Sequence, residues 1–321
     1  MLKINEVKDR LIKNNNKLRI VFPEGGEDKI IQTANKLIQE NIAIPVVIFN
    51  KQSEVPKNLD PKVEVICIDA YDTKKMAQEL VELRKNKLSY DEAFLLVQQN
   101  NYFATMLIKQ QKVDCMVCGL KYSTADTLKP ALQIIKTKPE FKLACSSIIM
   151  TKYDESYLFA DCSLNLNPDP EQLSEIAKMN ADFAISLETK NPQLALLSYS
   201  TLGSGKGESV EKVGKAVEIL NQSAQKFVYT GEIQFDAAFD NEVRAKKAPK
   251  SSLTRRPDIF VFPDLNSGNI GYKIAQRMGG YQAAGPFILG LNSPVNDLSR
   301  GASLVDVFNT SIITLYQAVK K

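Results

Sequence analysis

Strand-like and helix-like segments alternate along most of this chain, and this alternation constrains its fold more than any other feature. Residues 18–22 form a short apolar run typical of a strand, and the turn Pro-Glu-Gly-Gly follows at 23–26. Apolar residues then recur at helical spacing from Ile30 to Ile38, and residues 73–85 repeat the pattern of an amphipathic helix. Further strands are expected over residues 45–49, 63–68 and 113–119. This order predicts mainly parallel sheets flanked by helices, the α/β class.

The length of 321 residues exceeds what one hydrophobic core usually supports, so we expect two domains. The pattern changes near residue 140, where short strands at 141–150 and 157–160 lie close together in sequence. A helix over 171–179 and a strand over 194–199 follow, and a second α/β unit therefore begins near residue 140. The last helix is expected from about 303 to 320.

Composition excludes several classes of protein. The net charge of +4 is small for this length, and no dense basic tail points to a nucleic-acid partner. Residues 1–8 alternate charged and apolar side chains, unlike the apolar region of a signal peptide. No apolar run approaches the roughly 18 residues of a membrane span. We therefore expect a cytoplasmic protein without nucleic-acid or membrane partners.

The chain contains no histidine, so its chemistry must come from arginine, lysine, carboxylates, hydroxyls or cysteine. Five cysteines are present, and Cys115 and Cys118 form a lone C-x-x-C inside the expected strand 113–119. No second pair and no histidine could complete a zinc site, so no metal is expected. The cysteines are interpreted as buried structural thiols rather than a disulfide framework.

The run Asn-Asp-Leu-Ser-Arg-Gly at 296–301 is the strongest chemical signal. Arg300 carries a permanent planar charge that matches phosphate oxygens two at a time, and Ser299 adds a hydroxyl beside it. Asp306 follows six residues later and could face the same cleft. Ser303 and Asp306 also fit a capping box that opens the last helix, and the two interpretations of Asp306 are compatible.

A second candidate is the loop 122–127, which follows the expected strand 113–119. Ligands of open α/β sheets bind beyond the carboxyl ends of strands, where this loop offers backbone amides and the hydroxyls of Ser123, Thr124 and Thr127, with Lys129 nearby. The alternative is that serine and aspartate here only cap the next helix.

Other segments carry weaker signals. The loop 198–207 is not a P-loop, because Ser200 and Gly207 stand where that motif requires glycine and a hydroxyl residue; it could instead line a cleft. Arg84 and Arg277 lie near helix ends, where arginine also interacts favourably with the helix dipole. The segment 244–256 carries six basic residues and is interpreted as a solvated, mobile surface loop, or as a phosphate-facing flap.

Taken together, these segments resemble the phosphate acetyl/butyryl transferase family. The matching segments run in order along nearly the whole chain: 82–85, 123–137, 159–161, 197–201, 231–232, 236–238, 262–266, 268–269, 272–277 and 294–301. The resemblance implies two α/β domains with a cleft between them, one made of residues 1–140 and 290–321 and the other of residues 141–289. It also implies that the C-terminal helix returns to the first domain and that the protein is a homodimer.

The family's reaction moves an acetyl group reversibly between CoA and inorganic phosphate, so acetyl-CoA and acetyl phosphate are the expected substrates. By the resemblance, Ser299 and Arg300 contact the acyl phosphate and Asp306 takes the proton of the CoA thiol. Arg84 and Lys129 receive CoA, although the family commonly has arginine where this chain has Lys129. The substrate-binding set that the matching segments imply is Arg84, Ser123, Thr124, Thr127, Lys129, Ser200, Asn266 and Arg277, with Arg277 lining the anion site.

No cysteine lies in these matching site segments, so direct thiolate attack in a ternary complex is expected, with CoA as a substrate and no permanently bound cofactor. A butyryl-transferring enzyme of the same mechanism is an alternative, but the length and the segment 123–136 look more like the acetyl enzymes. A non-catalytic binding domain of the same fold is a more distant alternative. A dehydrogenase of related fold is disfavoured, because no G-x-G-x-x-G follows the first strand.

Overall fold

The structure is a computed structural model that describes residue 1 and residues 3–319, and it divides the chain into two compact units. The terminal unit comprises Lys3–Thr137 with Leu291–Lys321, and the central unit comprises Lys138–Gly290 with Met1–Leu2. Each unit has its own sheet flanked by helices, which confirms the predicted α/β class.

The terminal unit contains a sheet whose described strands all run parallel. Their order across the sheet is β11 (Val295–Asp297), β4 (Cys115–Cys118), β1 (Arg19–Phe22), β2 (Ile44–Phe49) and β3 (Glu64–Cys67). Four of these strands were predicted from apolar runs, with ends that differ by one or two residues. The strand β11 was not predicted, because it is short and two of its three residues are polar.

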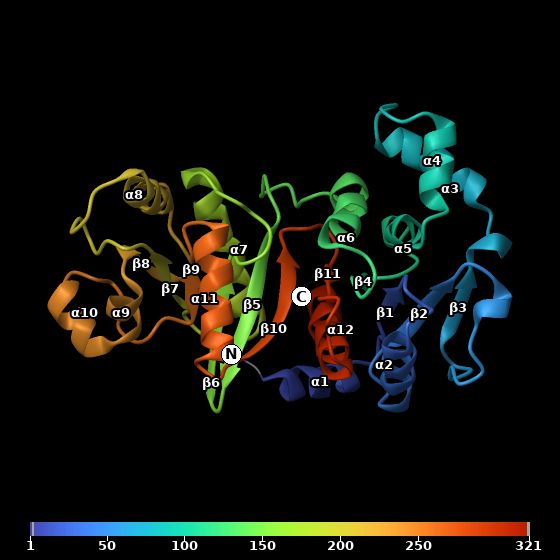
Figure 1. Ribbon diagram of the computed structural model, residues 1–321, viewed down its shortest axis with the longest axis horizontal. Helices are drawn as coiled ribbons and strands as arrows, with labels where there is room; N and C mark the ends of the chain where they lie inside the picture. Colours follow the sequence, from blue (N-terminus) through green and yellow to red (C-terminus); the bar gives the residue numbers. More distant parts are fainter. Residues whose placement is uncertain (2, 320–321) are drawn as a thin grey trace. The chain divides into compact units, whose positions relative to one another are not determined.

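Helices cover both faces of this sheet (Figure 1). The helices α2 (Asp28–Gln39) and α12 (Leu304–Ala318) pack on one face, and α5 (Asn100–Lys109) and α6 (Thr124–Pro130) lie on the other. The helix α12 begins one residue after the predicted start at 303, and the predicted end at Lys320 lies outside the described residues. The remaining helices of this unit are α1 (Ile4–Lys13), α3 (Thr73–Leu83), α4 (Tyr90–Val97), the short turns η1 (Gln52–Glu54) and η2 (Ile68–Ala70), and the π-helical segment η3 (Ala131–Ile135).

The strand order of the terminal unit reverses direction at β1. From β1 the chain moves outward through β2 and β3, and it then returns to place β4 and finally β11 on the other side of β1. The carboxyl ends of parallel strands next to such a reversal are where open α/β sheets bind ligands. The segments that leave β1, β4 and β11 therefore mark the place to search for a site.

The central unit contains a mixed sheet. The order of its described strands is β10 (Gln282–Leu289), β5 (Cys145–Lys152), β6 (Glu155–Ala160), β9 (Ile259–Val261), β7 (Gln193–Leu197) and β8 (Val228–Ile233). The strands β6, β9, β7 and β8 pair in parallel, whereas β5 runs antiparallel to both of its neighbours.

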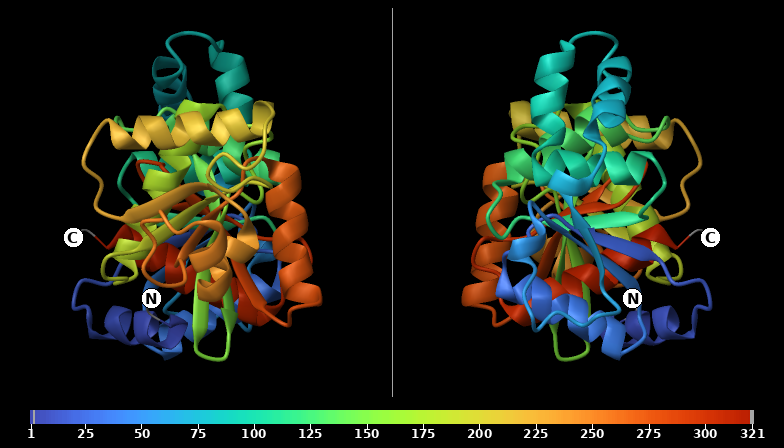
Figure 2. Two further views of the ribbon diagram at one scale, coloured as in Figure 1. Left: turned by 90° about the vertical axis from the view of Figure 1, so that its left-hand side faces the viewer. Right: turned by 90° about the vertical axis from the view of Figure 1, so that its right-hand side faces the viewer.

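The helices of the central unit lie on different sides of its sheet. The left view of Figure 2 shows α8 (Glu208–Asn221) in yellow and α11 (Leu265–Arg277) in orange on different sides. The helix α7 (Pro170–Ser186) packs against α8, while α9 (Phe235–Phe239) and α11 contribute to the aromatic core around Phe159 and Phe260. The unit also has α10 (Asn241–Lys247). Among the described residues, no helix has the length and apolar character needed to cross a bilayer.

The basic segment 244–256 is exposed at Lys246, Lys247, Lys250 and Arg255, as its composition suggested, but Arg244 departs from this prediction. Arg244 lies in α10 with 6% of its surface exposed, and its Nη1 donates a hydrogen bond to the carbonyl oxygen of Ala238 at 2.7 Å. Arg256 places its guanidinium 3.9 Å from the ring centroid of Phe239 and pairs with Glu155 at 2.7 Å. The prediction of a solvated loop is therefore wrong at Arg244, which is buried in a helix, whereas Arg256 stays partly exposed while its charge is paired with Glu155 and packed on Phe239.

Candidate active site

The loop that follows β4 is organised by a buried carboxylate from the end of β1. Oε2 of Glu24 accepts the backbone N–H of Gly119 at 2.9 Å and of Leu120 at 3.1 Å. Oε1 accepts the N–H of Lys121 at 2.6 Å and of Tyr122 at 3.0 Å. These four successive amides therefore bind the protein's own carboxylate, and the amide of Tyr122 is not open to a substrate anion.

Gly119 allows the ends of β4 and β11 to approach each other closely. Its φ of +118° is a conformation that side-chain-bearing residues rarely adopt. A Cβ atom at this position would lie 2.4 Å from Oδ1 of Asp297 and 2.6 Å from the backbone nitrogen of Leu298. Only glycine fits this place without displacing the end of β11.

The helix α6 starts with three of the predicted site hydroxyls, and each has a defined partner. Ser123 is the N-cap: its hydroxyl accepts the N–H of Asp126 at 3.2 Å and donates to the Asp126 carboxylate at 2.6 Å, as the capping alternative expected. Thr124 donates its hydroxyl to Oδ2 of Asp297 at 2.6 Å. Thr127 is fully buried and points its hydroxyl at the sulfur of Cys118 at 3.6 Å. Lys129 is exposed in the last turn of this helix.

Asp297, the last residue of β11, is a buried carboxyl group whose importance the sequence did not reveal. Only 4% of its surface is exposed, and its Oδ1 has no hydrogen-bond partner in the part of the chain that the structure describes. Burial, together with the nearby Glu24 carboxylate, raises the pKa of Asp297 to about 6, although the hydroxyls of Thr124 and Thr127 oppose this shift. Both residues lie inside motifs noted from the sequence. Glu24 lies just after the strand β1 and Asp297 is the last residue of β11, and this location at a strand end was the signal that could have marked them as site residues.

The predicted anion-binding pair lies on a short turn that is held at both ends. Before the turn, the N–H of Leu298 donates to the carbonyl oxygen of Cys118 at 2.7 Å, which extends the β11–β4 ladder by one residue. At its end, Nζ of Lys29 donates to the carbonyl oxygen of Ala302 at 2.6 Å. Ser299 and Arg300 between these anchors are exposed. A fixed backbone thus presents an exposed hydroxyl and an exposed guanidinium side by side.

Asp306 lies in the first turn of α12, as both interpretations of it require. Its Oδ2 accepts the N–H and the hydroxyl of Ser303, each at 2.8 Å, and the N–H of Asp306 donates back to the Ser303 hydroxyl at 3.2 Å. The capping box is therefore formed, and the carboxylate itself is exposed. The capping bonds orient the carboxylate without burying it.

Arg84 caps the carboxyl end of α3 and is half-buried. Its Nε is buried and has no hydrogen-bond partner within the described residues, so this guanidinium retains donor capacity. Its positive charge also reaches the phenol of Tyr102, whose pKa burial raises and Arg84 lowers. Tyr102 donates its hydroxyl to Oε1 of Gln133 at 3.1 Å.

Three predicted site residues belong to the central unit. Ser200 is fully buried, and its hydroxyl donates to Oε1 of Glu232 at 3.1 Å and accepts the N–H of Gly205 at 2.8 Å, so it organises its own loop. Asn266 and Arg277 are exposed in the first turn and at the last residue of α11. They lie eleven positions apart in the helix, roughly 16 Å along its axis, which is too far for both to hold one small anion.

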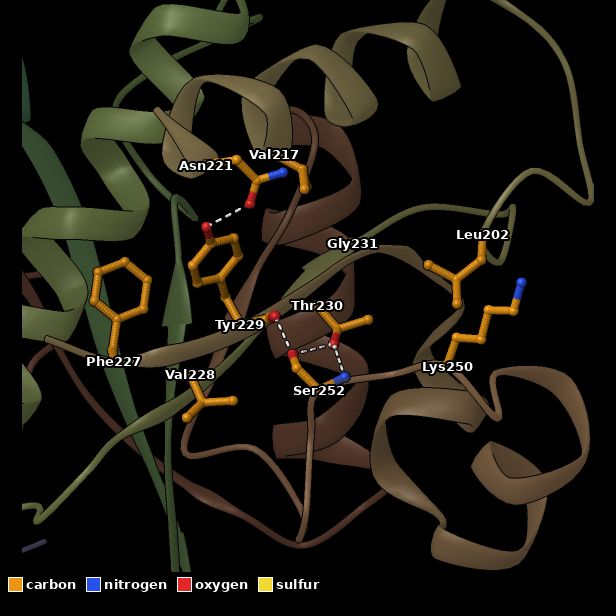
Figure 3. A pocket seen from close by; sticks show the side chains of 10 residues that line it. All are labelled: Leu202, Val217, Asn221, Phe227, Val228, Tyr229, Thr230, Gly231, Lys250 and Ser252. Atoms are coloured by element: carbon orange, nitrogen blue, oxygen red, sulfur yellow. Dashed lines mark hydrogen bonds between the residues drawn. The ribbon is translucent and has the colours of Figure 1, made fainter. Parts of the chain in front are cut away.

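A cavity of about 410 Å³ in the central unit does not coincide with any predicted site residue (Figure 3). It lies beside α8 and the edge strand β8. The polar groups that line it satisfy one another: Tyr229 donates to Oδ1 of Asn221 at 2.7 Å, and the hydroxyls of Thr230 and Ser252 lie 2.8 Å apart. Lys250 is the one charged side chain among the lining residues, so no cluster of charges there calls for a ligand.

Comparison with known proteins shows the family of the chain. A family described as "Phosphate acetyl/butaryl transferase" matches residues 3–315. The chain is 51% identical to the phosphate acetyltransferase of Mycoplasma capricolum over 319 residues, which cover 98% of this chain and 99% of that protein. Among solved structures, the EutD phosphotransacetylase from Staphylococcus aureus superposes with a TM-score of 0.90 at 43% identity, covering 98% of each chain. A phosphotransacetylase from Streptococcus pyogenes superposes with a TM-score of 0.91 at 42% identity, covering 99% of each chain. By these matches over nearly its full length, the chain belongs to the phosphate acetyl/butyryl transferase family.

Proposed function

We propose that this protein transfers an acetyl group reversibly between CoA and inorganic phosphate by direct attack of the CoA thiolate on acetyl phosphate. The observation that carries the proposal is the exposed Ser299–Arg300 turn, anchored by Leu298 and Lys29 at the carboxyl ends of parallel strands, with the carboxylate of Asp306 at the following helix start. CoA acts as a substrate, and no permanently bound cofactor or metal takes part.

The residues of this turn suit the charge that develops during transfer. As the sulfur–carbon bond forms, the carbonyl oxygen of acetyl phosphate gains negative charge, and the bond to the phosphate oxygen then breaks. Arg300 and the Ser299 hydroxyl would stabilise that oxygen and the departing phosphate. Preorganised donors of this kind typically contribute about 3–4 kcal/mol each to transition-state stabilisation.

Asp306 would accept the proton of the CoA thiol. Its Oδ2 is occupied by Ser303, while Oδ1 makes no hydrogen bond with any residue that the structure describes and is therefore available to the thiol. A free thiol has a pKa near 8.5, and a cation such as Arg300 close to the sulfur would favour the thiolate. The proton then returns to solvent from an exposed carboxyl group.

CoA carries several phosphates, and the proposed receptors for it in the terminal unit are Arg84 and Lys129. The half-buried guanidinium of Arg84 and the exposed ammonium of Lys129 both carry donors for phosphate oxygens. The hydroxyls of Ser123 and Thr127 are engaged within the protein, so we propose that they support α6 rather than contact CoA directly.

For the central unit, we propose that Arg277 provides an anion contact and that Asn266 contacts a different part of the bound substrates. We also retain as proposals the division into domains of residues 1–140 with 290–321 and residues 141–289, and the homodimer. Light scattering coupled to size-exclusion chromatography tests the dimer, which predicts the mass of two chains.

The decisive experiment measures phosphate- and arsenate-dependent release of CoA from acetyl-CoA by the purified protein, without added metal or nicotinamide. We expect turnover that falls about 100- to 1,000-fold in Arg300→Ala and recovers only in part in Arg300→Lys, which keeps the charge but loses the fork. Arg255→Ala is the matched control, since Arg255 is an exposed arginine already paired with Asp258 at 2.7 Å, and its turnover should be unchanged.

Butyryl-CoA assayed beside acetyl-CoA distinguishes the two acyl-transfer activities. We expect acetyl-CoA to give the higher kcat/KM. No CoA release by the folded wild-type protein with either substrate would overturn the proposed activity and leave a binding domain.

A further inference from the structure

We propose that Asp297 is a positioning residue that fixes the Ser299–Arg300 turn through its hydrogen bond with Thr124. This inference rests on the proposed function of that turn. It assigns to Asp297 and Thr124 a joint role that neither residue would perform alone.

The hydrogen bond joins two segments that are far apart in the sequence, and Thr127 of the same helix also lies close enough to the Asp297 carboxyl to lower its pKa. Thr124 is the first residue of α6, and Asp297 is the last residue of β11, 173 positions later in the chain. The 2.6 Å bond between them therefore ties the start of α6 to the strand end from which the catalytic turn departs. Arg300 follows only three residues after this tie.

The surroundings of Asp297 hold its carboxyl group in one place. Gly119 lies so close to the carboxyl group that a Cβ atom added to it would be 2.4 Å from Oδ1 of Asp297. The next residue, Leu298, is held by the hydrogen bond from its N–H to the carbonyl oxygen of Cys118. The charged and titratable groups that face the carboxyl are Glu24 from the end of β1 and Cys118 from β4. Neither of these two groups donates a hydrogen bond to Oδ1. The hydrogen bond from the Thr124 hydroxyl to Oδ2 therefore fixes the orientation of the carboxyl group.

Burial separates the role of Asp297 from that of the substrate-contacting residues. With 4% of its surface exposed, the side chain does not reach a substrate, whereas Ser299 and Arg300 are exposed. A buried carboxyl group with one unpaired oxygen is unfavourable for stability, and an apolar residue of similar size would be less costly. A functional role in placing the turn accounts for the presence of a carboxyl group at this position.

Loss of the link should lower kcat more than it weakens CoA binding. A displacement of about 1 Å of a catalytic group is enough to lower the rate about 100-fold. Of the two proposed CoA receptors, Arg84 caps α3 rather than α6, and Lys129 lies in the last turn of α6, away from the link at its first residue, so both should keep their places. We therefore expect Asp297→Ala and Thr124→Val each to lower kcat about 10- to 100-fold, with the KM for CoA changed by less than about threefold.

The test is a double-mutant cycle in the full-length protein, using phosphate-dependent CoA release. Because both substitutions break one link, the double variant should be no slower than the slower single variant within about threefold. Thr124→Ser keeps the hydroxyl and should restore kcat to within about threefold of wild type, and Asp297→Asn, which keeps an acceptor oxygen, should also retain most of it. Thr73→Val is the matched control, since Thr73 likewise begins a helix and bonds a side chain, that of Gln98, and its kcat should not change.

Several outcomes would overturn the inference. Additive effects would mean that Thr124 contacts substrate independently of Asp297, and a Thr124→Val variant with normal kcat would mean that the link has no role. Thr124 is exposed, so this variant decides the question even if Asp297→Ala does not fold. Arg300→Ala assayed in parallel keeps the two proposals distinct: if it remains fully active, the proposed function of the turn fails, whatever the Asp297 variants do.

Discussion

Asp306 and Ser303 are joined by three hydrogen bonds, two of them donated by Ser303 to the Asp306 carboxylate at 2.8 Å. The carboxylate proposed to take the thiol proton is therefore also part of the structure that starts α12. The two roles use different oxygens and predict different consequences of mutation.

Ser303→Ala should separate capping from catalysis. Removing the hydroxyl costs the helix cap about 1 kcal/mol of unfolding free energy but leaves the carboxylate in place, so kcat should stay within about threefold. Asp306→Asn should lose a comparable stability and lower kcat about 100- to 10,000-fold, because the general base is gone. Urea denaturation and steady-state kinetics of both variants make the comparison. Near-normal turnover of Asp306→Asn would leave the residue as a cap alone.

Glu24 should be among the most sensitive positions for stability. Glu24→Ala leaves the N–H groups of Gly119, Leu120, Lys121 and Tyr122 without their acceptor, and we expect a loss of about 3–5 kcal/mol in the free energy of unfolding. Glu27→Gln is the control, since Glu27 pairs with Lys121 near the surface and should contribute no more than about 1 kcal/mol. Equal losses in the two variants, measured by urea denaturation, would contradict this account of the loop.

The sequence predicted most of the parallel sheet, because buried strands produce apolar runs that are visible without any partner. The strand β11 produces no such run: Asn296 and Asp297 are polar, and they are buried because β4 pairs with the strand while α12 and α6 cover these side chains. Pairing with a distant strand, rather than local pattern, decides its structure.

The exposed part of the candidate site was also accessible from the sequence, since Ser299, Arg300 and Asp306 lie within eight residues of one another. The supporting part was not. Glu24, Gly119 and Asp297 come from three strand ends that are far apart in sequence, and only the strand order β11-β4-β1 brings them together. Arg244 illustrates the same limit in the central unit, where a basic residue in a basic segment is buried by contacts that its neighbours in sequence do not reveal.

Asp297 should make the stability of the protein depend on pH in a defined direction. Its pKa is about 6 in the folded protein, above the ordinary 3.8, so the folded state holds this proton more tightly than the unfolded state. The protonated Asp297 carboxyl therefore stabilises the folded state fully below about pH 4, and this contribution to the free energy of unfolding is lost as the pH rises to about 6. It corresponds to roughly 3 kcal/mol, at about 1.4 kcal/mol for each unit of pKa shift.

Asp297→Asn should therefore gain stability relative to wild type across this window. The difference in unfolding free energy, variant minus wild type, should rise by up to about 3 kcal/mol between pH 4 and pH 7 and remain constant above it. Urea denaturation at closely spaced pH values measures this difference. A difference that stays flat from pH 4 to pH 7 would show that Asp297 ionises in the folded protein as it does in the unfolded chain.

Lys129→Arg should strengthen CoA binding. The substitution keeps the positive charge in the last turn of α6 and adds a planar fork that binds phosphate oxygens in pairs, so the KM for CoA should fall about two- to fivefold with kcat unchanged. Lys121→Arg is the matched control, because Lys121 is exposed on the preceding loop but already paired with Glu27. An unchanged KM in Lys129→Arg would remove Lys129 from the proposed CoA site.

The cysteines should be dispensable for turnover, since direct transfer requires no acetylated enzyme. All five cysteines, which lie within the described residues, are free thiols, and four of them are buried. Burial raises the pKa of Cys115, Cys118, Cys145 and Cys162 well above its ordinary value, so these thiols do not form the thiolate that a nucleophile requires. Cys67 is partly exposed and should react first with a thiol reagent, without loss of activity. Replacing all five by alanine or serine should keep turnover of the folded protein within about tenfold of wild type, and isolation of a radiolabelled acetyl-cysteine from acetyl phosphate would refute direct transfer.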